Sequence, residues 1–328
     1  MNISIIILIT LFLKSKTLDL KRVCLSPERK EVDWYVIFLY PEKSTSSNKL
    51  LYGYFDEYSN DLINIEYKKE TFPPNLLTEL TLDKNNNNFN YFFWNDDNTC
   101  IDDIKKMSCS NSKAHAKGTL IYDKNGGSFL LHSLPRFPSR YINGTIINDL
   151  PSNSGLNGQS FLCISINQNS AEKIAKILNF INVCNNKSVM KDRVNMSPLN
   201  IIKSLKRKEF KFFSKNNKDK VIPFDTTIRE KFNDDFYVRT WTRPQSAPPI
   251  CDNYKILNVL KVDFKGISFD DTKEHSKWAV GIKKNIICFS DLNHTTSQIN
   301  RGGNIVCFRD DKLARIMRKS VQLTDKCF

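Results

Sequence analysis

The stretches His115-Ala-Lys117-Gly118-Thr-Leu-Ile-Tyr122 and His275-Ser-Lys277-Trp278-Ala-Val-Gly-Ile282 decide how this sequence is interpreted. Only four histidines occur in 328 residues, and two of them open the same His-x-Lys pattern, one in each half of the chain. In both stretches a run rich in aliphatic residues follows the lysine and predicts a β-strand. Residues two apart on a strand point to the same face, so each motif would present a histidine beside a lysine.

The sequence after each motif is also repeated. In the first copy, the turn Asp123-Lys-Asn-Gly-Gly127 separates the strand from a second one over residues 128–133. In the second copy, a Lys-Lys-Asn turn leads to residues 286–291, and we align the closing Ser290 with Ser133. The His-x-Lys spacing alone is weak support, because 49 of 328 residues are Lys or Arg. The recurrence of motif, strand, turn and strand in one order favours an internal duplication.

The composition is that of a globular protein with an excess of positive charge. Forty per cent of the residues are hydrophobic and 26% are charged, and the net charge is +14. A strongly basic protein attracts polyanions, so nucleic acid is the favoured partner. The alternative is a basic secreted protein without such a partner.

The first 13 residues are almost entirely apolar and are followed by Lys14-Ser-Lys16. This run is too short to span a membrane and is typical of a signal peptide, which we place at residues 1–19. No later segment is long and apolar enough to be transmembrane, so we expect no stable membrane association. We expect a secreted protein, with the lysosome as the alternative destination.

Nine cysteines without a Cys-x-x-Cys pair indicate disulfides rather than a zinc site. The odd number leaves at least one cysteine free or paired outside the chain. Sequons for N-glycosylation agree with a secretory route; they lie at Asn143, Asn186 and Asn195.

A helix is expected after the strand at residues 160–166, with Asn169 as N-cap and Glu172 three residues later. We divide the chain here into an N-terminal half (20–167) and a C-terminal half (168–328). Further strands are expected at residues 32–40 and 51–55. The apolar face of the helix comprises Ile174, Ile177, Leu178 and Ile181.

Residues 203–220 contain eight basic residues with Phe210, Phe212 and Phe213 among them. Basic residues mixed with aromatic ones can bind nucleic acid. An amphipathic helix or loop with buried phenylalanines and solvated lysines is an equally good interpretation.

Seven short segments, taken together, resemble the deoxyribonuclease II family in their order along the chain, from about residue 24 to the end. They are Val32-Asp-Trp, His115-Ala-Lys-Gly, His132-Ser-Leu-Pro-Arg-Phe-Pro138, Gly158-Gln-Ser-Phe-Leu-Cys-Ile-Ser165, His275-Ser-Lys-Trp-Ala-Val280, Ser290-Asp-Leu-Asn293 and Arg301-Gly-Gly303. The resemblance implies an α/β fold with mixed (α+β) sheets. It also implies a phospholipase D-like pseudo-dimer, in which two similar halves, each a sheet flanked by helices, share one active site at their seam.

The resemblance further implies an endonuclease that cleaves DNA best in acid, needs no metal or other cofactor, and leaves 3′-phosphate ends. We assign His115 as nucleophile and His275 as general acid, although the two roles could be exchanged. Lys117 and Lys277 would hold the phosphate oxygens.

Further site residues come from the matching segments. Asp291, Asn293 and Arg301 are expected to bind substrate or to support the residues that do. His132 would do the same, or it is a structural histidine. Asn293-His-Thr295 is also a sequon, but a glycan there would block DNA, so we predict that Asn293 is unmodified. His294 stands where the family has an arginine, a difference that would alter phosphate contacts.

The disulfides that the resemblance suggests are Cys24–Cys163, Cys251–Cys327 and Cys288–Cys307. A local pair, Cys100–Cys109, would then leave Cys184 over. Two other functions remain open: a DNA-binding or host-directed protein of the same fold without turnover, and a phosphodiesterase that acts on lipid. The oligomeric state is also open, since a pseudo-dimer within one chain has no need to dimerise for catalysis.

Overall fold

The computed structural model describes residues 22–68, 72, 89–96, 113–137, 140–142, 145–147, 150–184, 196–242 and 246–327. Several sequence predictions lie outside these ranges: the signal peptide at residues 1–19, Cys100, Cys109, and the sequons at Asn143, Asn186 and Asn195.

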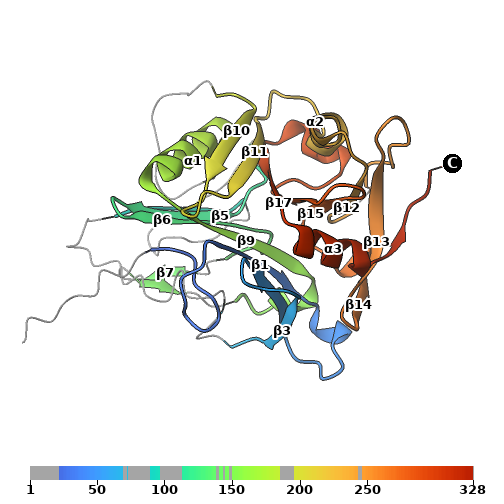
Figure 1. The fold of residues 1–328 in the computed structure, drawn as a ribbon, viewed down its shortest axis with the longest axis horizontal. Helices are drawn as coiled ribbons and strands as arrows, with labels where there is room; N and C mark the ends of the chain where they lie inside the picture. The colour runs from blue at the N-terminus through green and yellow to red at the C-terminus, as the bar shows by residue number, and fades with distance from the viewer. Residues whose placement is uncertain are drawn as a thin grey trace, which may run out of the picture.

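Two large β-sheets make up most of the described chain (Figure 1). The first has seven antiparallel strands in the order β3-β2-β1-β9-β6-β5-β4. Its strands are β1 (Trp34–Leu39), β2 (Leu51–Asp56), β3 (Ile63–Glu66), β4 (Asn90–Trp94), β5 (Gly118–Asp123), β6 (Gly126–His132) and β9 (Gln159–Ile166).

The second sheet has nine strands, eight of them in the order β10-β11-β17-β16-β15-β12-β13-β14, while β18 pairs with β13. Its one parallel pair is β12 with β13. The strands are β10 (Leu199–Lys203), β11 (Glu209–Lys215), β12 (Phe236–Arg239), β13 (Ile256–Phe264), β14 (Ile267–Asp270), β15 (Trp278–Gly281), β16 (Ile286–Ser290), β17 (Gly303–Arg309) and β18 (Val321–Thr324).

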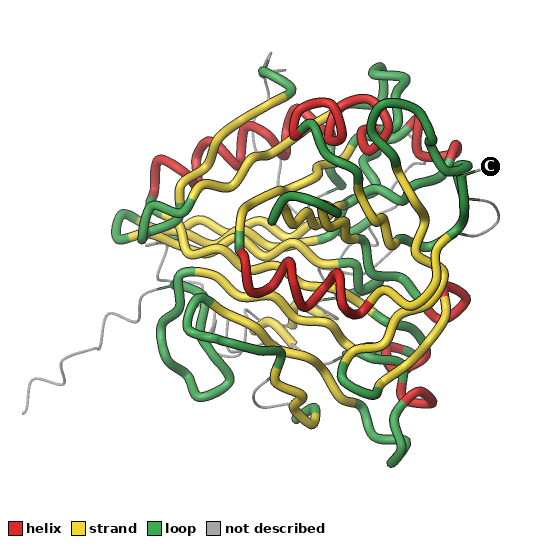
Figure 2. Tube along the Cα trace, turned by 45° about the vertical axis from the view of Figure 1, so that its right-hand side comes forward, coloured by secondary structure: helices red, strands yellow, loops and turns green. Residues whose placement is uncertain are grey.

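Helices are few, and they lie against the strands (Figure 2). The α-helices within the described ranges are α1 (Gln168–Ile181), α2 (Arg229–Phe232) and α3 (Asp311–Ser320), and a separate hairpin pairs β7 (Arg140–Ile142) with β8 (Thr145–Ile147). In the described part of the chain no helix is both long and apolar enough to cross a membrane. The fold is therefore mixed α/β, as expected, with two large sheets.

One hydrophobic core joins the two sheets. Trp34 of β1 contacts Phe308 of β17, with ring centroids 5.0 Å apart. Phe129 of β6 and Phe212 of β11 make a second contact at 5.4 Å. The same core takes in the buried faces of α1 and α3. Burial of these large aromatic surfaces is the main force that holds the sheets together.

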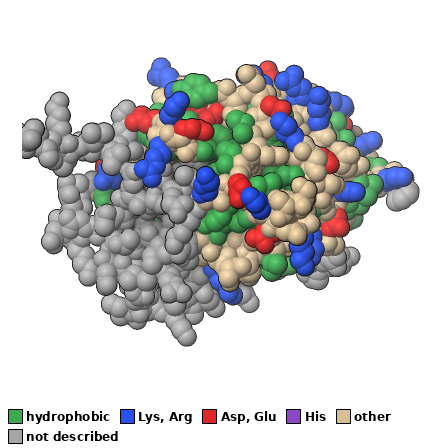
Figure 3. All heavy atoms as spheres, turned by 90° about the horizontal axis from the view of Figure 1, so that it is seen from below, with side chains coloured by type: hydrophobic (Ala, Val, Ile, Leu, Met, Phe, Trp, Pro, Cys, Tyr) green, Lys and Arg blue, Asp and Glu red, His purple; other side chains and the backbone are tan. Residues whose placement is uncertain are grey.

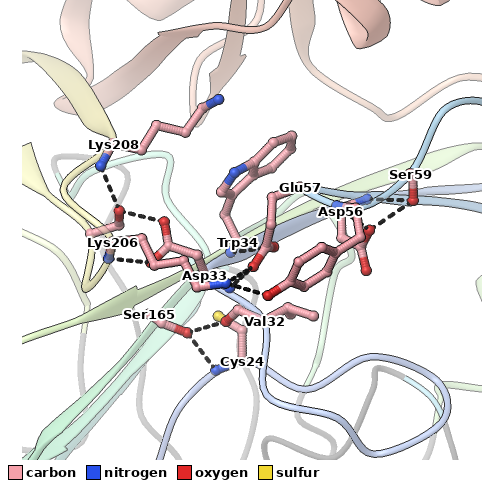
Figure 4. A network of polar contacts seen from close by, with 12 residues as sticks. Cys24, Val32, Asp33, Trp34, Asp56, Glu57, Ser59, Ser165, Lys206 and Lys208 are labelled. Atoms are coloured by element: carbon pink, nitrogen blue, oxygen red, sulfur yellow. Dashed lines mark hydrogen bonds and ion pairs between the residues drawn. The ribbon is translucent and has the colours of Figure 1, made fainter.

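A polar network fastens the same two sheets at one end (Figure 4). The buried carboxylate of Asp33, next to β1, accepts hydrogen bonds from the Ser204 hydroxyl (2.6 Å) and the Lys206 backbone N–H (2.8 Å), both in the turn between β10 and β11. Lys206 also forms an ion pair with Glu57 at 2.9 Å. The carboxylate is thus paired by strong hydrogen bonds, as a buried charge requires.

The strands predicted over residues 32–40, 51–55 and 160–166 are confirmed as β1, β2 and β9, and the two predicted hairpins as β5–β6 and β15–β16. The predicted helix is confirmed as α1, but its N-cap is Asn167 rather than Asn169. The Asn167 side chain accepts from the Ser170 N–H at 2.8 Å. The predicted apolar face is buried.

The alignment of the two closing serines is wrong by one residue. The backbone N–H of His132 donates to the carbonyl of Lys117 (3.2 Å), and the N–H of Ser290 donates to that of Lys277 (2.9 Å). His132 and Ser290 are therefore equivalent, and Ser133 corresponds to Asp291. A shift of one residue matters because it moves a side chain to the other face of the sheet.

The basic and aromatic stretch at residues 203–220 is centred on a strand rather than on a helix or loop, but its phenylalanines are buried, as the second interpretation expects. Residues 209–215 form β11, which lies between β10 and β17 and is covered on both faces. Its phenylalanines are all buried, Phe210 and Phe212 in the core between the sheets and Phe213 beneath the second sheet. They cannot stack on nucleic-acid bases.

Three disulfides join the pairs that the resemblance suggests, Cys24–Cys163, Cys251–Cys327 and Cys288–Cys307. The expectation that Cys184 is left over is wrong, because Cys184 is also disulfide-bonded. The Cys184 carbonyl accepts from the Asn95 N–H at 3.2 Å, so Cys184 lies beside the segment that follows β4. The expected Cys100–Cys109 pair rests on closeness in sequence, which cannot reveal that Cys184 lies beside the segment after β4.

Candidate active site

The first His-x-Lys motif leads directly into β5, but residues of the second half hold it in place. The backbone N–H of His115 donates to the Gly302 carbonyl at 3.0 Å. The ring Nδ1 lies 2.8 Å from the Asp291 carbonyl, which can only accept, so Nδ1 carries the proton. In the neutral ring, Nε2 then keeps its lone pair and is free to act as a nucleophile.

Gly302 is a position where a side chain cannot fit. A Cβ atom there would lie 2.2 Å from the carbonyl oxygen of Ile181, at the end of α1. The chain passes this close to α1 just before β17 begins, and it thereby brings the Gly302 carbonyl to His115. This contact explains the first glycine of Arg301-Gly-Gly303.

The second motif leads into β15 and is held by the first half in the same way. The His275 N–H donates to the Gly158 carbonyl at 2.8 Å, and the Lys277 N–H donates to the Ser160 hydroxyl at 3.2 Å. Gly158 immediately precedes β9, as Gly302 precedes β17. Each motif is thus fixed by the strand end of the opposite half.

A buried ion pair stiffens the second motif further. Glu274 and Arg239 are 1% and 0% exposed, and Arg239 Nε donates to the Glu274 carboxylate at 3.0 Å. The other carboxylate oxygen accepts the Ser276 backbone N–H at 2.9 Å. A buried charge pair is stable only when both partners remain hydrogen-bonded, so this pair fixes the backbone on either side of His275.

The lysines of the two motifs lower the pKa values of both motif histidines, in addition to the effect of burial. Burial lowers the pKa of His275 to about 4, with further contributions from Lys277 and Lys117. Burial also holds the pKa of His115 well below its usual value, again with contributions from Lys117 and Lys277. Each lysine therefore acts on the histidine of the other motif as well as its own. The structure brings all four predicted catalytic residues into one site.

Lys277 and Asp291 are buried and strongly perturbed. Burial, followed by the charge of Lys117, lowers the pKa of Lys277 to about 7. Burial raises the pKa of Asp291 to about 7, although hydrogen bonds from Asn304 oppose it. Asp291 does not point at His115 with its carboxylate; it contacts the ring through its backbone carbonyl. Such perturbed groups concentrate at functional sites.

Arg301 joins the site from the second half. Its Nε donates to the Lys113 carbonyl at 3.0 Å, and its Nη2 donates to the Ala114 carbonyl at 3.1 Å. The same Nη2 donates to the Asp96 carboxylate at 3.0 Å. Arg301 therefore holds the backbone just ahead of His115, as well as carrying a charge into the site.

Three other residues that the sequence singled out are buried. His132 is 3% exposed and its ring stacks on Phe161, but neither ring nitrogen has a hydrogen-bond partner among the described residues, so both interpretations of His132 stay open. Asn293 is 6% exposed, so its side chain has little room for a glycan. His294 is fully buried, and its ring nitrogens lie 2.7 Å from Asn258 and 2.6 Å from Asp225. Its ring cannot reach a DNA phosphate, so it does not replace an arginine that binds one.

Sequence reasoning missed Asp96, Glu274 and Trp241. Trp241, 38% exposed, stacks on the His275 ring with centroids 4.1 Å apart. Glu274 directly precedes His275 in the sequence, and an acidic residue beside a motif that contains a lysine is a signal that could have identified it. Asp96 and Trp241 follow strands at places that no spacing rule marks. Across the residues that the structure describes, no three His, Cys, Asp or Glu side chains gather where they could hold a metal ion.

Comparison with known proteins identifies relatives over nearly the whole chain. The profile of the deoxyribonuclease II family matches residues 23–327. Deoxyribonuclease-2-alpha of Rattus norvegicus is 26% identical over 338 residues, which cover 93% of this chain and 94% of that protein. Plancitoxin-1 of Acanthaster planci is 28% identical, covering 93% and 92%. Deoxyribonuclease-2-alpha of Mus musculus is 27% identical and covers 87% of each.

Proposed function

Because the chain belongs to the deoxyribonuclease II family, we propose that it hydrolyses DNA in acid without a metal ion, through a phosphohistidine intermediate that leaves 3′-phosphate ends. The observation that carries this proposal is that residues of the opposite half hold each motif. The His115 N–H donates to the Gly302 carbonyl at 3.0 Å, and the His275 N–H donates to the Gly158 carbonyl at 2.8 Å. Two histidines and two lysines in one site are the groups that such a reaction needs.

In the first step the lone pair of His115 Nε2 attacks phosphorus, and the bond from phosphorus to the 5′-oxygen breaks. His275 donates its proton to that oxygen, giving a 5′-hydroxyl. In the second step His275 takes a proton from water, which attacks the phosphohistidine and releases the 3′-phosphate. Lys117 and Lys277 hold the non-bridging oxygens as negative charge builds up, with Asn293 beside them.

The protonation that each role requires supports this assignment of the two histidines. A nucleophile must be neutral, and the pKa of His115 is held well below its usual value. A general acid must be protonated, and His275, with a pKa of about 4, becomes so in acid. The hydrogen bond from His115 Nδ1 to the Asp291 carbonyl supports the same assignment, because it leaves the lone pair on Nε2.

We also propose that the chain is a phospholipase D-like pseudo-dimer of the halves 20–167 and 168–328. Support comes from equivalent hydrogen bonds in the two halves. The Ser160 N–H donates to the Ser133 hydroxyl, and the Asn304 N–H donates to the Asp291 carboxylate, both at 2.9 Å. Ser133 and Asp291 directly follow the two motif hairpins, so the correspondence extends beyond the motifs.

The net charge of +14 favours DNA over an uncharged substrate. On the face in Figure 3, basic side chains are scattered over the described part with acidic ones among them, so attraction on that face is spread rather than gathered in one patch. We place the protein in the secretory route, either secreted or lysosomal, because disulfides form in oxidising compartments.

The test is cleavage of supercoiled plasmid at about pH 5 in excess chelator. The wild type should nick the plasmid, while His115→Ala and Lys117→Met should lose activity by at least about 100-fold. Lys283→Met is the matched control for charge, because the Lys283 side chain is 73% exposed and forms an ion pair with Asp235 at 3.1 Å. Cleavage that requires added metal contradicts the mechanism, and plasmid that is bound but uncut supports a binding protein.

A further inference from the structure

The carboxylate of Asp96, just after β4, lies among three positively charged or protonatable groups. One of its oxygens accepts a hydrogen bond from Lys117 Nζ. The other accepts from Arg301 Nη2 at 3.0 Å and lies 3.6 Å from His115 Nε2. The Asp96 side chain is only 8% exposed, so this is an enclosed cluster rather than a surface ion pair.

The position of this carboxylate relative to the nucleophile is unusual. Because His115 Nδ1 carries the proton, Nε2 presents a lone pair, which a carboxylate oxygen cannot use. The separation of 3.6 Å is too long for a hydrogen bond. It is close to the distance of about 3–3.5 Å at which two reacting atoms must be held. A carboxylate oxygen therefore lies at about the distance from Nε2 at which the phosphorus under attack would have to be held.

The cationic partners of Asp96, Lys117 and Arg301, are also of the kind that binds phosphate. Lys117 and Arg301 are 6% and 20% exposed in their side chains, and both donate to this one anion. Arg and Lys together suit a group with several negative oxygens. Burial alone would raise the pKa of Asp96, but the charge and hydrogen bond of Lys117, together with the charge of Arg301, hold the pKa below its usual range. Asp96 thus remains an anion.

We propose that Asp96 is an internal anion that occupies the place of the scissile phosphate in the substrate-free protein, and that a bound phosphate must displace it from Lys117 and Arg301. The identity of the natural displacing group, a DNA phosphodiester, rests on the proposed function. Displacement lowers the apparent affinity of the site, because only the fraction of molecules in which Asp96 has moved away can bind.

The test measures binding of inorganic phosphate to the full-length protein by titration calorimetry at about pH 5. If Asp96 is displaced in fewer than about one molecule in ten, Asp96→Asn should bind phosphate at least about tenfold more tightly than wild type. The matched control is Asp61→Asn, which removes the same charge from an exposed ion pair with Lys265. The control should bind phosphate as weakly as wild type.

Equal or weaker phosphate binding by Asp96→Asn overturns the inference, because Asp96 would then orient Lys117 and Arg301 rather than compete for them. If this variant is unstable without an anion, phosphate should raise its unfolding temperature more than that of wild type, and the absence of that difference also overturns the inference. Phosphate binding requires no DNA cleavage. A protein that fails to cleave DNA but shows the expected affinities contradicts only the proposed function.

Discussion

The rate of DNA cleavage should depend on pH in a way that follows from His275. We expect kcat/KM to rise about tenfold for each unit that the pH falls from 7 to 5, and to level off near pH 4. The reason is that His275 must carry a proton to act as general acid, and burial, with Lys277 and Lys117, lowers its pKa to about 4. If the general acid were an exposed histidine with a pKa near 6.5, kcat/KM would level off at a pH more than two units higher.

The expected magnitude follows from this pKa. A lowering from 6.5 to about 4 favours the neutral ring by roughly 3 kcal/mol, at about 1.4 kcal/mol for each unit. About one molecule in ten then carries the proton at pH 5, and about one in a thousand at pH 7. The ratio of the two rates should be about 100. Burial, followed by the charge of Lys117, also holds the pKa of His115 well below its usual value, which favours the neutral ring that a nucleophile requires.

The assay is the initial rate of cleavage of a fluorescent oligonucleotide at low concentration, in chelator, across this pH range. Lys277→Met should move the midpoint of the profile to higher pH, because Lys277 is the charged group that lowers the pKa of His275 most. The maximum rate of this variant will fall, but the midpoint is the pH at which the rate reaches half of the variant's own maximum. A wild-type profile that is flat between pH 5 and 7, or a midpoint that Lys277→Met leaves in place, refutes the reasoning.

Three further predictions concern buried groups near the site. Glu274→Gln leaves the fully buried Arg239 without its charge partner and should lower the free energy of unfolding by about 3 kcal/mol in a urea titration; a loss under about 1 kcal/mol contradicts it. Burial lowers the pKa of His132 to about 3, so its folded form resists a proton that the unfolded chain accepts near pH 6.5, and stability is lost as the pH falls between these values. His132→Phe should therefore lose about 2 kcal/mol less than wild type between pH 7 and 5, and equal losses would show that folding does not lower the pKa of His132. Glycopeptide mapping should find Asn293 unmodified, since it is 6% exposed, whereas an occupied sequon would argue against a working site.

The features that could be predicted from sequence are those that depend on local patterns. The strands and hairpins around the two motifs follow from runs of β-branched and aromatic residues between turns. Alternation fails in β11, because Phe212 and Phe213 are neighbours that point to opposite faces, and both faces are covered. A strand buried on both sides has no period of two to detect.

Local signals also compete where two residues of the same type are close. Asn167 and Asn169 both precede the apolar face of α1, and only the observed hydrogen bond to the Ser170 N–H decides between them. Asp96 could not be predicted for a different reason. Its role depends on Lys117 and on Arg301, which is 205 residues away in sequence. Such a contact exists only after the two halves have come together.

The most direct measurement is the identification of the phosphorylated residue. A thymidine 3′-(p-nitrophenyl phosphate) substrate has a leaving group that departs without a proton, so His275→Ala should complete the first step. It should then accumulate the intermediate, because the base for the second step is missing. Mass spectrometry after rapid quenching should find the nucleotide bound through its 3′-phosphoryl group to His115 in this variant, and no adduct in His115→Ala. An adduct on His275 in the His115→Ala protein, or none in either variant, would contradict the mechanism.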